Sequence, residues 1–209
     1  MSRNRKGLMG VVGVAVVALA LCLSSTAGTI AGTDHDFSSQ GWSNGEICVV
    51  CHTPHNANTT VTAAPLWNHQ VSTATYTVYS SGTLNATVGQ PDGATKLCLS
   101  CHDGTVAIDS FGGRTGTQMM SGGALVGTSL SNDHPVSFTY DSALATTDAG
   151  LKNPASATSG LGSTIAADML DGGKMQCSSC HDVHNGSGVS KLLLKSNAGS
   201  ALCLTCHTK

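Results

Sequence analysis

The chain has 209 residues and a formal net charge of −2, and its composition is unusual in several respects. Aromatic residues make up only 4% and charged residues only 11% of it, whereas it contains nine Cys, nine His and 25 Gly. The small net charge excludes a polybasic nucleic-acid-binding protein, and sparse charge with many cysteines excludes an ordinary disordered tail. So few large apolar side chains predict that covalent links or bound cofactors help to stabilise the fold.

The first 31 residues have the order of a secretory signal peptide, because basic residues precede an apolar run over 8–23 and small residues follow it. Cleavage after Ala27 and cleavage after Ala31 both fit a small-residue site. The run is shorter than the roughly 20 residues that a membrane-spanning helix needs, so a retained anchor is the less favoured alternative. We expect an exported mature chain of residues 32–209 with no stable membrane span, and with Cys22 removed.

The other eight cysteines form four pairs of one spacing, and a His follows each pair directly. C-x-x-C-H is the covalent attachment motif of c-type haem. Two thiols two residues apart reach both vinyl groups on one edge of the porphyrin, and the next residue offers an imidazole to the iron as proximal ligand. We therefore predict four haem c groups. Their attachment residues are Cys48, Cys51, Cys98, Cys101, Cys177, Cys180, Cys203 and Cys206, and their proximal ligands are His52, His102, His181 and His207.

The cysteine pairs allow three other interpretations. Four disulfides would suit an exported chain, but a disulfide framework does not require a His after each pair. Two zinc ions could each be held by four thiolates, although the segment between Cys180 and Cys203 exceeds the usual ribbon spacing and zinc would leave the four His unused. Redox-active dithiols usually occur once per domain, not four times.

Four six-coordinate irons also need four distal ligands, and five His outside the motifs are available. These distal candidates are His35, His55, His69, His134 and His184. One of the five is surplus on this count, and the spacing does not single it out. Met ligation would raise the reduction potential, but the Met residues at 119, 120, 169 and 175 are interpreted as gap-filling apolar residues.

Two distal candidates, His55 and His184, each follow a proximal His by three residues. Three extended residues span roughly 10 Å, which is too short to pass around a porphyrin to the opposite face of the same iron. If His55 and His184 bind iron, they must bind the iron of a neighbouring haem. The haems would then lie in close pairs.

The remaining chain predicts a loop-rich fold with short helices and few strands, organised around the four haems. Alternating Thr residues over 71–79 predict a strand. Short helical turns are expected on entering Cys98 and Cys203, the second capped by Ser196 or Asn197. A short helix is expected within 141–151, whereas 110–131 and 154–163 are rich in Gly, Ser and Thr and predict loops. Two unequal halves, about 32–110 and 111–209, would carry two haems each.

The ordered motifs resemble those of multihaem c-type cytochromes exported by metal-reducing bacteria, among them tetrahaem outer-surface cytochromes that polymerise into filaments. The segments that carry the resemblance are Thr33–Asp36, Cys48–His55, Pro65–His69, Leu97–Gly104, Asn132–Ser137 and Cys177–His184. It implies a loop-rich fold, ligation of every iron by two His, and a haem chain continued from subunit to subunit. In such filaments a distal ligand can come from the neighbouring subunit.

The leading functional hypothesis is electron transfer without chemistry on a substrate, because an iron held by two His has no open position. The protein would be a homopolymer, an extracellular filament at or beyond the outer cell surface. It would take respiratory electrons from periplasmic or outer-membrane cytochromes and pass them to external acceptors. The alternative is a monomeric tetrahaem carrier, periplasmic or surface-bound. An enzyme, such as a multihaem reductase, is disfavoured because all four motifs end in His and distal His are in surplus.

Overall fold

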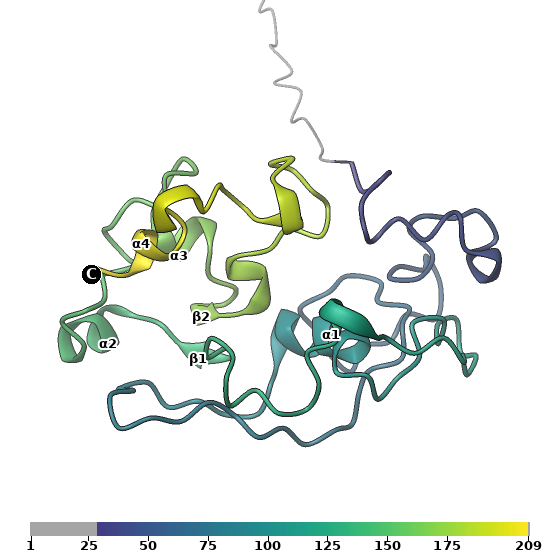
Figure 1. Cartoon of the computed structure of the whole chain (residues 1–209), viewed down its shortest axis with the longest axis horizontal. Helices are drawn as coiled ribbons and strands as arrows, with labels where there is room; N and C mark the ends of the chain where they lie inside the picture. The colour runs from purple at the N-terminus through teal and green to yellow at the C-terminus, as the bar shows by residue number, and fades with distance from the viewer. Residues whose placement is uncertain (1–28, 209) are drawn as a thin grey trace, which may run out of the picture.

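The structure is a computed structural model that describes residues 29–208, so nearly all of the expected signal peptide lies outside the described residues. Most of the described chain is loop (Figure 1). Its regular elements are the helices α1 (Gly93–His102), α2 (Ser142–Thr147), α3 (Ile165–Asp168) and α4 (Cys203–Cys206), the strands β1 (Phe138–Thr139) and β2 (Lys174–Met175), and the 3₁₀ turns η1 (Gly41–Ser43), η2 (Gly122–Ala124), η3 (Cys177–Ser179), η4 (Ser190–Leu192) and η5 (Ala198–Ser200). None of the helices within 29–208 is long and apolar enough to cross a membrane.

The helices expected from the sequence are present, with different lengths. The turn expected before Cys98 is the ten-residue helix α1, which contains the whole second C-x-x-C-H motif. Helix α2 begins after Asp141, whose carboxylate accepts a hydrogen bond from the backbone N–H of Leu144 (2.8 Å), and it ends at Thr147. The chain enters α4 through η5. The cap expected from Ser196 or Asn197 is wrong, because the N-cap of α4 is Leu202 and neither η5 nor α4 has a side-chain cap bond; the Asn197 side chain instead accepts a hydrogen bond from the Leu202 N–H (3.1 Å).

The strand expected over 71–79 is wrong. The predicted alternation is present, since the Thr side chains are exposed and Tyr76 is buried, but only Thr77 forms a bridge, to Ser129. Beside it, the Gln90 side chain takes the place of a neighbouring strand: its Oε1 accepts from the Tyr76 N–H (2.8 Å) and its Nε2 donates to the Tyr76 carbonyl (2.9 Å). An amide side chain pairs with one residue only, so no ladder continues along the segment.

The one small sheet within 29–208 was not predicted. Strands β1 and β2 pair antiparallel, with Phe138 opposite Met175 and Thr139 opposite Lys174. Two-residue strands carry too little alternation to stand out in a sequence. Their pairing brings the segment before the third C-x-x-C-H motif against the middle of the chain.

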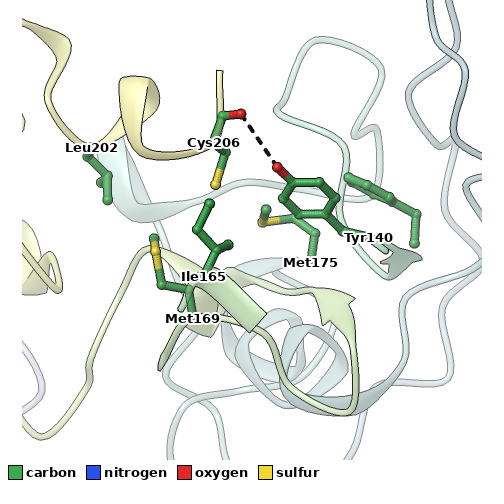
Figure 2. Close-up of a cluster of buried hydrophobic side chains, with 7 residues drawn as sticks. Tyr140, Ile165, Met169, Met175, Leu202 and Cys206 are labelled. Atoms are coloured by element: carbon green, nitrogen blue, oxygen red, sulfur yellow. Dashed lines mark hydrogen bonds between the residues drawn. The ribbon is translucent and has the colours of Figure 1, made fainter. Parts of the chain in front are cut away.

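The apolar side chains form three small clusters. The largest lies among the second-half elements α3, α4, β1 and β2 (Figure 2). Its buried members are Phe138, Tyr140, Ile165, Met169, Met175, Leu202 and Cys206. The interpretation of Met169 and Met175 as apolar packing residues is therefore confirmed, whereas Met119 is exposed.

The other two clusters surround α1. One contains Val61, Trp67, Val71 and Leu97, and the other contains Tyr76, Leu99 and Leu130. Leu130 reaches α1 from beyond residue 110, and Ala86 and Val88 of the first half pack against the large second-half cluster. Contacts thus cross the expected boundary between the halves, and the division itself stays a prediction.

Candidate haem-attachment sites

Each C-x-x-C-H motif forms about one turn of helix. In the first, third and fourth motifs the N–H of the His donates to the carbonyl of the first Cys, at 2.8 Å for His52 and 3.0 Å for both His181 and His207. The second motif forms the end of α1. Residues i, i+3 and i+4 share one face of a helical turn. The two thiols and the imidazole of every motif are therefore presented on the same side.

Main-chain carbonyls hold the rings of three of the motif histidines. The Nδ1 of His52 donates to the Pro65 carbonyl (3.0 Å), that of His102 to Ala124 (2.7 Å) and that of His181 to Lys191 (2.9 Å). Because a carbonyl can only accept, each bond places a proton on Nδ1, and in the neutral ring Nε2 then keeps its lone pair. This is the tautomer and orientation that a metal-binding His needs.

The structure places three motif histidines beside three of the distal candidates. The ring centres of His35 and His102 are 6.0 Å apart, those of His52 and His184 are 6.3 Å apart, and those of His134 and His207 are 6.3 Å apart. The angles between the ring planes are 49°, 16° and 74°, respectively. Each pair joins one C-x-x-C-H motif to a His outside the motifs.

These separations fit one metal ion between the two rings. A metal–imidazole bond is about 2 Å long and the nitrogen lies roughly 1 Å from its ring centre, so two imidazoles on opposite sides of an iron have centres about 6 Å apart. His134 also has its Nδ1 bound, to the Pro135 carbonyl (2.9 Å), which leaves Nε2 for a metal. Burial and the neighbouring His102 lower the pKa of His35, so that its imidazole is neutral and able to bind a metal.

The pair of His184 with His52 is the arrangement that the spacing argument requires, since His184 faces a motif other than its own. Its counterpart His55 is exposed and forms no ring contact within 29–208. His181 is exposed as well; its Nδ1 binds the Lys191 carbonyl, and its charge adds to the effect of burial in lowering the pKa of His35, although the two rings form no ring contact in the described chain. The roles of all these histidines as iron ligands stay predictions.

His69 lies in a different environment, only 1% exposed. Both of its ring nitrogens face main-chain carbonyls: Nδ1 lies 2.8 Å from the Gln70 oxygen, and Nε2 lies 3.0 Å from the Ala107 oxygen. Burial lowers the pKa of His69, and these carbonyl contacts oppose that effect. Its ring also touches the Cys101 sulfur, at 3.5 Å from Nε2. His69 is thus packed inside the fold beside the second motif.

No disulfide joins the eight motif cysteines in the described chain. Within 29–208 no group of three or more His, Cys, Asp or Glu side chains is arranged to hold a metal ion. Burial raises the pKa of Cys51 to about 11 and that of Cys101 to about 12. A hydrogen bond between the Cys98 and Cys177 side chains lowers the pKa of Cys177 to about 7 and raises that of Cys98. The second and third motifs therefore meet at their first cysteines.

Some residues that shape these sites were not identified from the sequence. Trp67 packs edge-on against His52 at 6.4 Å between ring centres, and its buried Nε1–H has no hydrogen-bond partner in the structure. Trp67 belongs to the segment that runs antiparallel beside the first motif, where the Thr53 N–H donates to the Leu66 carbonyl (2.9 Å). The P-L-W-N-H order was the available signal for it. No motif marks Ala124 or Lys191, which contribute only main-chain carbonyls.

No curated protein matches the chain. Residues 170–209, which contain the third and fourth motifs, match the family model described as the doubled CXXCH motif. The match covers the end of the chain, where the Cys177–His181 turn is followed by helix α4. Over these residues the doubled motif indicates haem c attachment and electron transfer of the multihaem cytochrome kind.

Proposed function

We propose that this protein is an exported tetrahaem c-type cytochrome that transfers electrons without transforming a substrate. The observation that carries the proposal is the set of three imidazole pairs, each joining a C-x-x-C-H motif to a His elsewhere in the chain at 6.0–6.3 Å. A catalytic haem needs an open axial position. Pairs of imidazoles occupy both positions and favour electron transfer over enzymatic chemistry.

The chain's own residues would hold the cofactors in a simple scheme. The two Cys of each motif form the thioether links and its His binds the iron. On the opposite side, His184 would serve the first motif, His35 the second and His134 the fourth. A bound haem supplies an iron that alternates between Fe(II) and Fe(III), which is one-electron chemistry. Two His and no Met predict low reduction potentials at every iron.

His181 of the third motif is then left with His55 and His69 as candidates. We assign His69 a structural role, because both its nitrogens face carbonyls and it is buried beside Cys101. That leaves His55, which is exposed like His181. We propose that His55 of one copy completes the third site of the next. A contact between copies would then explain both why His55 is surplus within one copy and why His181 forms no ring pair within the described chain.

Repetition of that contact would produce a homopolymer, an extracellular filament that carries respiratory electrons from periplasmic or outer-membrane cytochromes to external acceptors. The second candidate is a monomeric carrier, in the periplasm or on the cell surface, in which His55 reaches His181 within one chain. Negative-stain electron microscopy of haem-positive material sheared from cells separates the two. Filaments that disappear on deletion of the gene support the polymer, and dispersed particles support the carrier.

The electron-transfer proposal has its own test. The purified exported protein is reduced and exposed to carbon monoxide, and near-infrared magnetic circular dichroism identifies the axial ligands of the oxidised form. We expect four low-spin irons with two His each and no rapid binding of carbon monoxide. A high-spin iron, or one that binds carbon monoxide in the native protein, would revive the enzyme alternative.

A further inference from the structure

Helix α1 and turn η3, which carry the second and third attachment motifs, cap each other. The Oε1 of Gln176 accepts a hydrogen bond from the N–H of Thr95 (3.2 Å), in the first turn of α1. In the opposite direction, the Oγ1 of Thr95 accepts from the N–H of Cys177 (3.0 Å), the first residue of η3. The first N–H groups of a helix have no partner inside it. Each element therefore supplies a side chain that satisfies the other.

The usual capping residue of α1 is occupied elsewhere. Asp92 is at the N-cap position but forms no side-chain bond to the helix. Instead its Oδ1 accepts from the Nε2 of Gln176 (2.9 Å), and its Oδ2 forms an ion pair with Lys174. The Ser137 hydroxyl adds a third bond to Gln176, donating to Oε1 at 3.1 Å. Gln176, 2% exposed, is thus the centre of a network that joins the two halves of the chain.

The backbone at the start of α1 makes room for this amide. Gly93 has a φ of +48°, in the left-handed region that favours glycine. A Cβ at this position would lie 2.9 Å from the Nε2 of Gln176, closer than side chains pack. Both the conformation and the missing side chain of Gly93 therefore serve the approach of Gln176.

The network lies against the attachment residues themselves. Cys98 is three residues beyond Thr95 in α1, and Cys177 directly follows Gln176. The bond from the Cys177 N–H to the Thr95 side chain holds Cys177 at the turn of α1 that leads into Cys98. The capping bonds therefore fix the separation between the attachment edges of the second and third haems.

We propose that Gln176 is a positioning residue that sets the spacing of the second and third haems, and with it the electron step between the halves of the chain. This inference rests on the proposed tetrahaem function. Sequence reasoning gives Gln176 no role, because it lies outside every C-x-x-C-H motif. Gln176 would act indirectly, by holding together the starts of α1 and η3, the two elements that carry the motifs.

The test compares Soret circular dichroism of full-length haem-loaded variants, because excitonic coupling between haems depends on their separation and angle. Gln176→Leu should keep four low-spin haems with two His each and lose part of the bisignate Soret signal. Gln90→Leu is the matched control: it breaks the two bonds to Tyr76, both within the first half, and should leave the signal unchanged. Gln176→Glu should disturb the signal through repulsion from Asp92, and adding Asp92→Asn should restore it.

An unchanged Soret signal in Gln176→Leu, or an equal loss in Gln90→Leu, would overturn the inference. If Gln176→Leu does not accumulate with its haems, the comparison of Gln176→Glu alone with Gln176→Glu combined with Asp92→Asn decides instead, and an equal Soret signal in these two variants would overturn the inference. Failure of the proposed function is separate. It would show in the wild-type protein, as missing haems or a high-spin iron, whereas failure of the inference leaves wild-type spectra as expected.

Discussion

The imidazole rings of His52 and His184 lie stacked, with centres 6.3 Å apart and 16° between their planes, although His52 belongs to the first attachment motif and His184 follows the third. His184 is only three residues from His181, the motif His nearest to it in sequence. If His184 binds the iron of the first motif, the first and third haems would lie next to each other. Electron transfer between halves of the chain would then depend on short steps across this contact and across the Cys98–Cys177 junction.

The His52–His184 assignment predicts which haem responds to a substitution. His184→Met should convert one of four irons from two His to His and Met, and raise its potential. In a background that lacks the first haem, made by Cys48→Ala with Cys51→Ala, the same substitution should change none of the three remaining irons. Near-infrared magnetic circular dichroism counts the ligand types.

His134→Met is the control in that background, because it serves the fourth motif and should still convert one iron. If His184→Met converted an iron that is present without the first haem, the assignment of His184 to His52 would be wrong.

The structural role of His69 predicts a loss of stability without a change of ligands. The neutral His69 ring donates one hydrogen bond, to the carbonyl of Gln70 or of Ala107, and His69→Leu leaves that carbonyl without its donor, which should lower the free energy of unfolding by about 1–3 kcal/mol. Urea denaturation measures the loss, and spectroscopy should still find two His at each iron. Loss of a His pair in this variant would make His69 a ligand and remove it from the structural role.

The lowered pKa of His69 also predicts a dependence of stability on pH. Above the ordinary value of 6.5, His69 is neutral in the folded and unfolded chains and contributes no pH dependence. Below 6.5 the unfolded chain takes up a proton that the buried imidazole does not, so stability should fall as the pH decreases toward the folded-state pKa. Urea midpoints between pH 7.5 and 5, at roughly half-unit steps, measure this slope. His69→Leu should have a shallower slope than the wild type.

The large apolar cluster predicts a graded response to mutation. Ile165 is fully buried, so Ile165→Ala should cost about 2–5 kcal/mol. The Tyr140 hydroxyl donates to the carbonyl of Lys152 (2.6 Å) and lies 3.4 Å from that of Cys206 (Figure 2). Tyr140→Phe removes these bonds but keeps the ring, and should cost only about 0.5–1.5 kcal/mol. Thermal denaturation monitored in the Soret band compares the two, and equal costs would contradict the packing described for Ile165.

Removal of the haems should abolish the compact fold. The three apolar clusters within 29–208 are small, and binding and folding are coupled in small domains of this kind. A chain with all eight motif cysteines changed to Ala should be expanded by size-exclusion chromatography and should unfold without a cooperative transition. A compact and cooperative haem-free chain would show that the polypeptide folds unaided.

Sequence alone predicted the features that depend on local patterns. The four motifs, the helical turn on entering Cys98, the short helix within 141–151 and the loop-rich character all follow from short-range patterns. The strand over 71–79 failed because the partner of Tyr76 is a side chain, that of Gln90, which no periodicity reveals. Alternation predicts an exposed and a buried face, but a strand also needs a continuous backbone partner.

The relationships across the chain were outside the reach of the sequence. Counting gave five distal candidates, and spacing excluded His184 from its own motif, but only the folded chain places it against His52. The burial of His69 between carbonyls and the position of Gln176 between two helix ends arise from long-range packing. No local sequence feature of a Gln before a Cys predicts that its side chain connects two helix ends.

The most direct test of the account is the intact mass of the purified exported protein, combined with metal analysis and the pyridine haemochrome spectrum. The account predicts a red mature chain with four covalently attached haems, four irons and no zinc. A colourless protein that contains zinc or disulfides, or a chain with fewer than four haems, would contradict it.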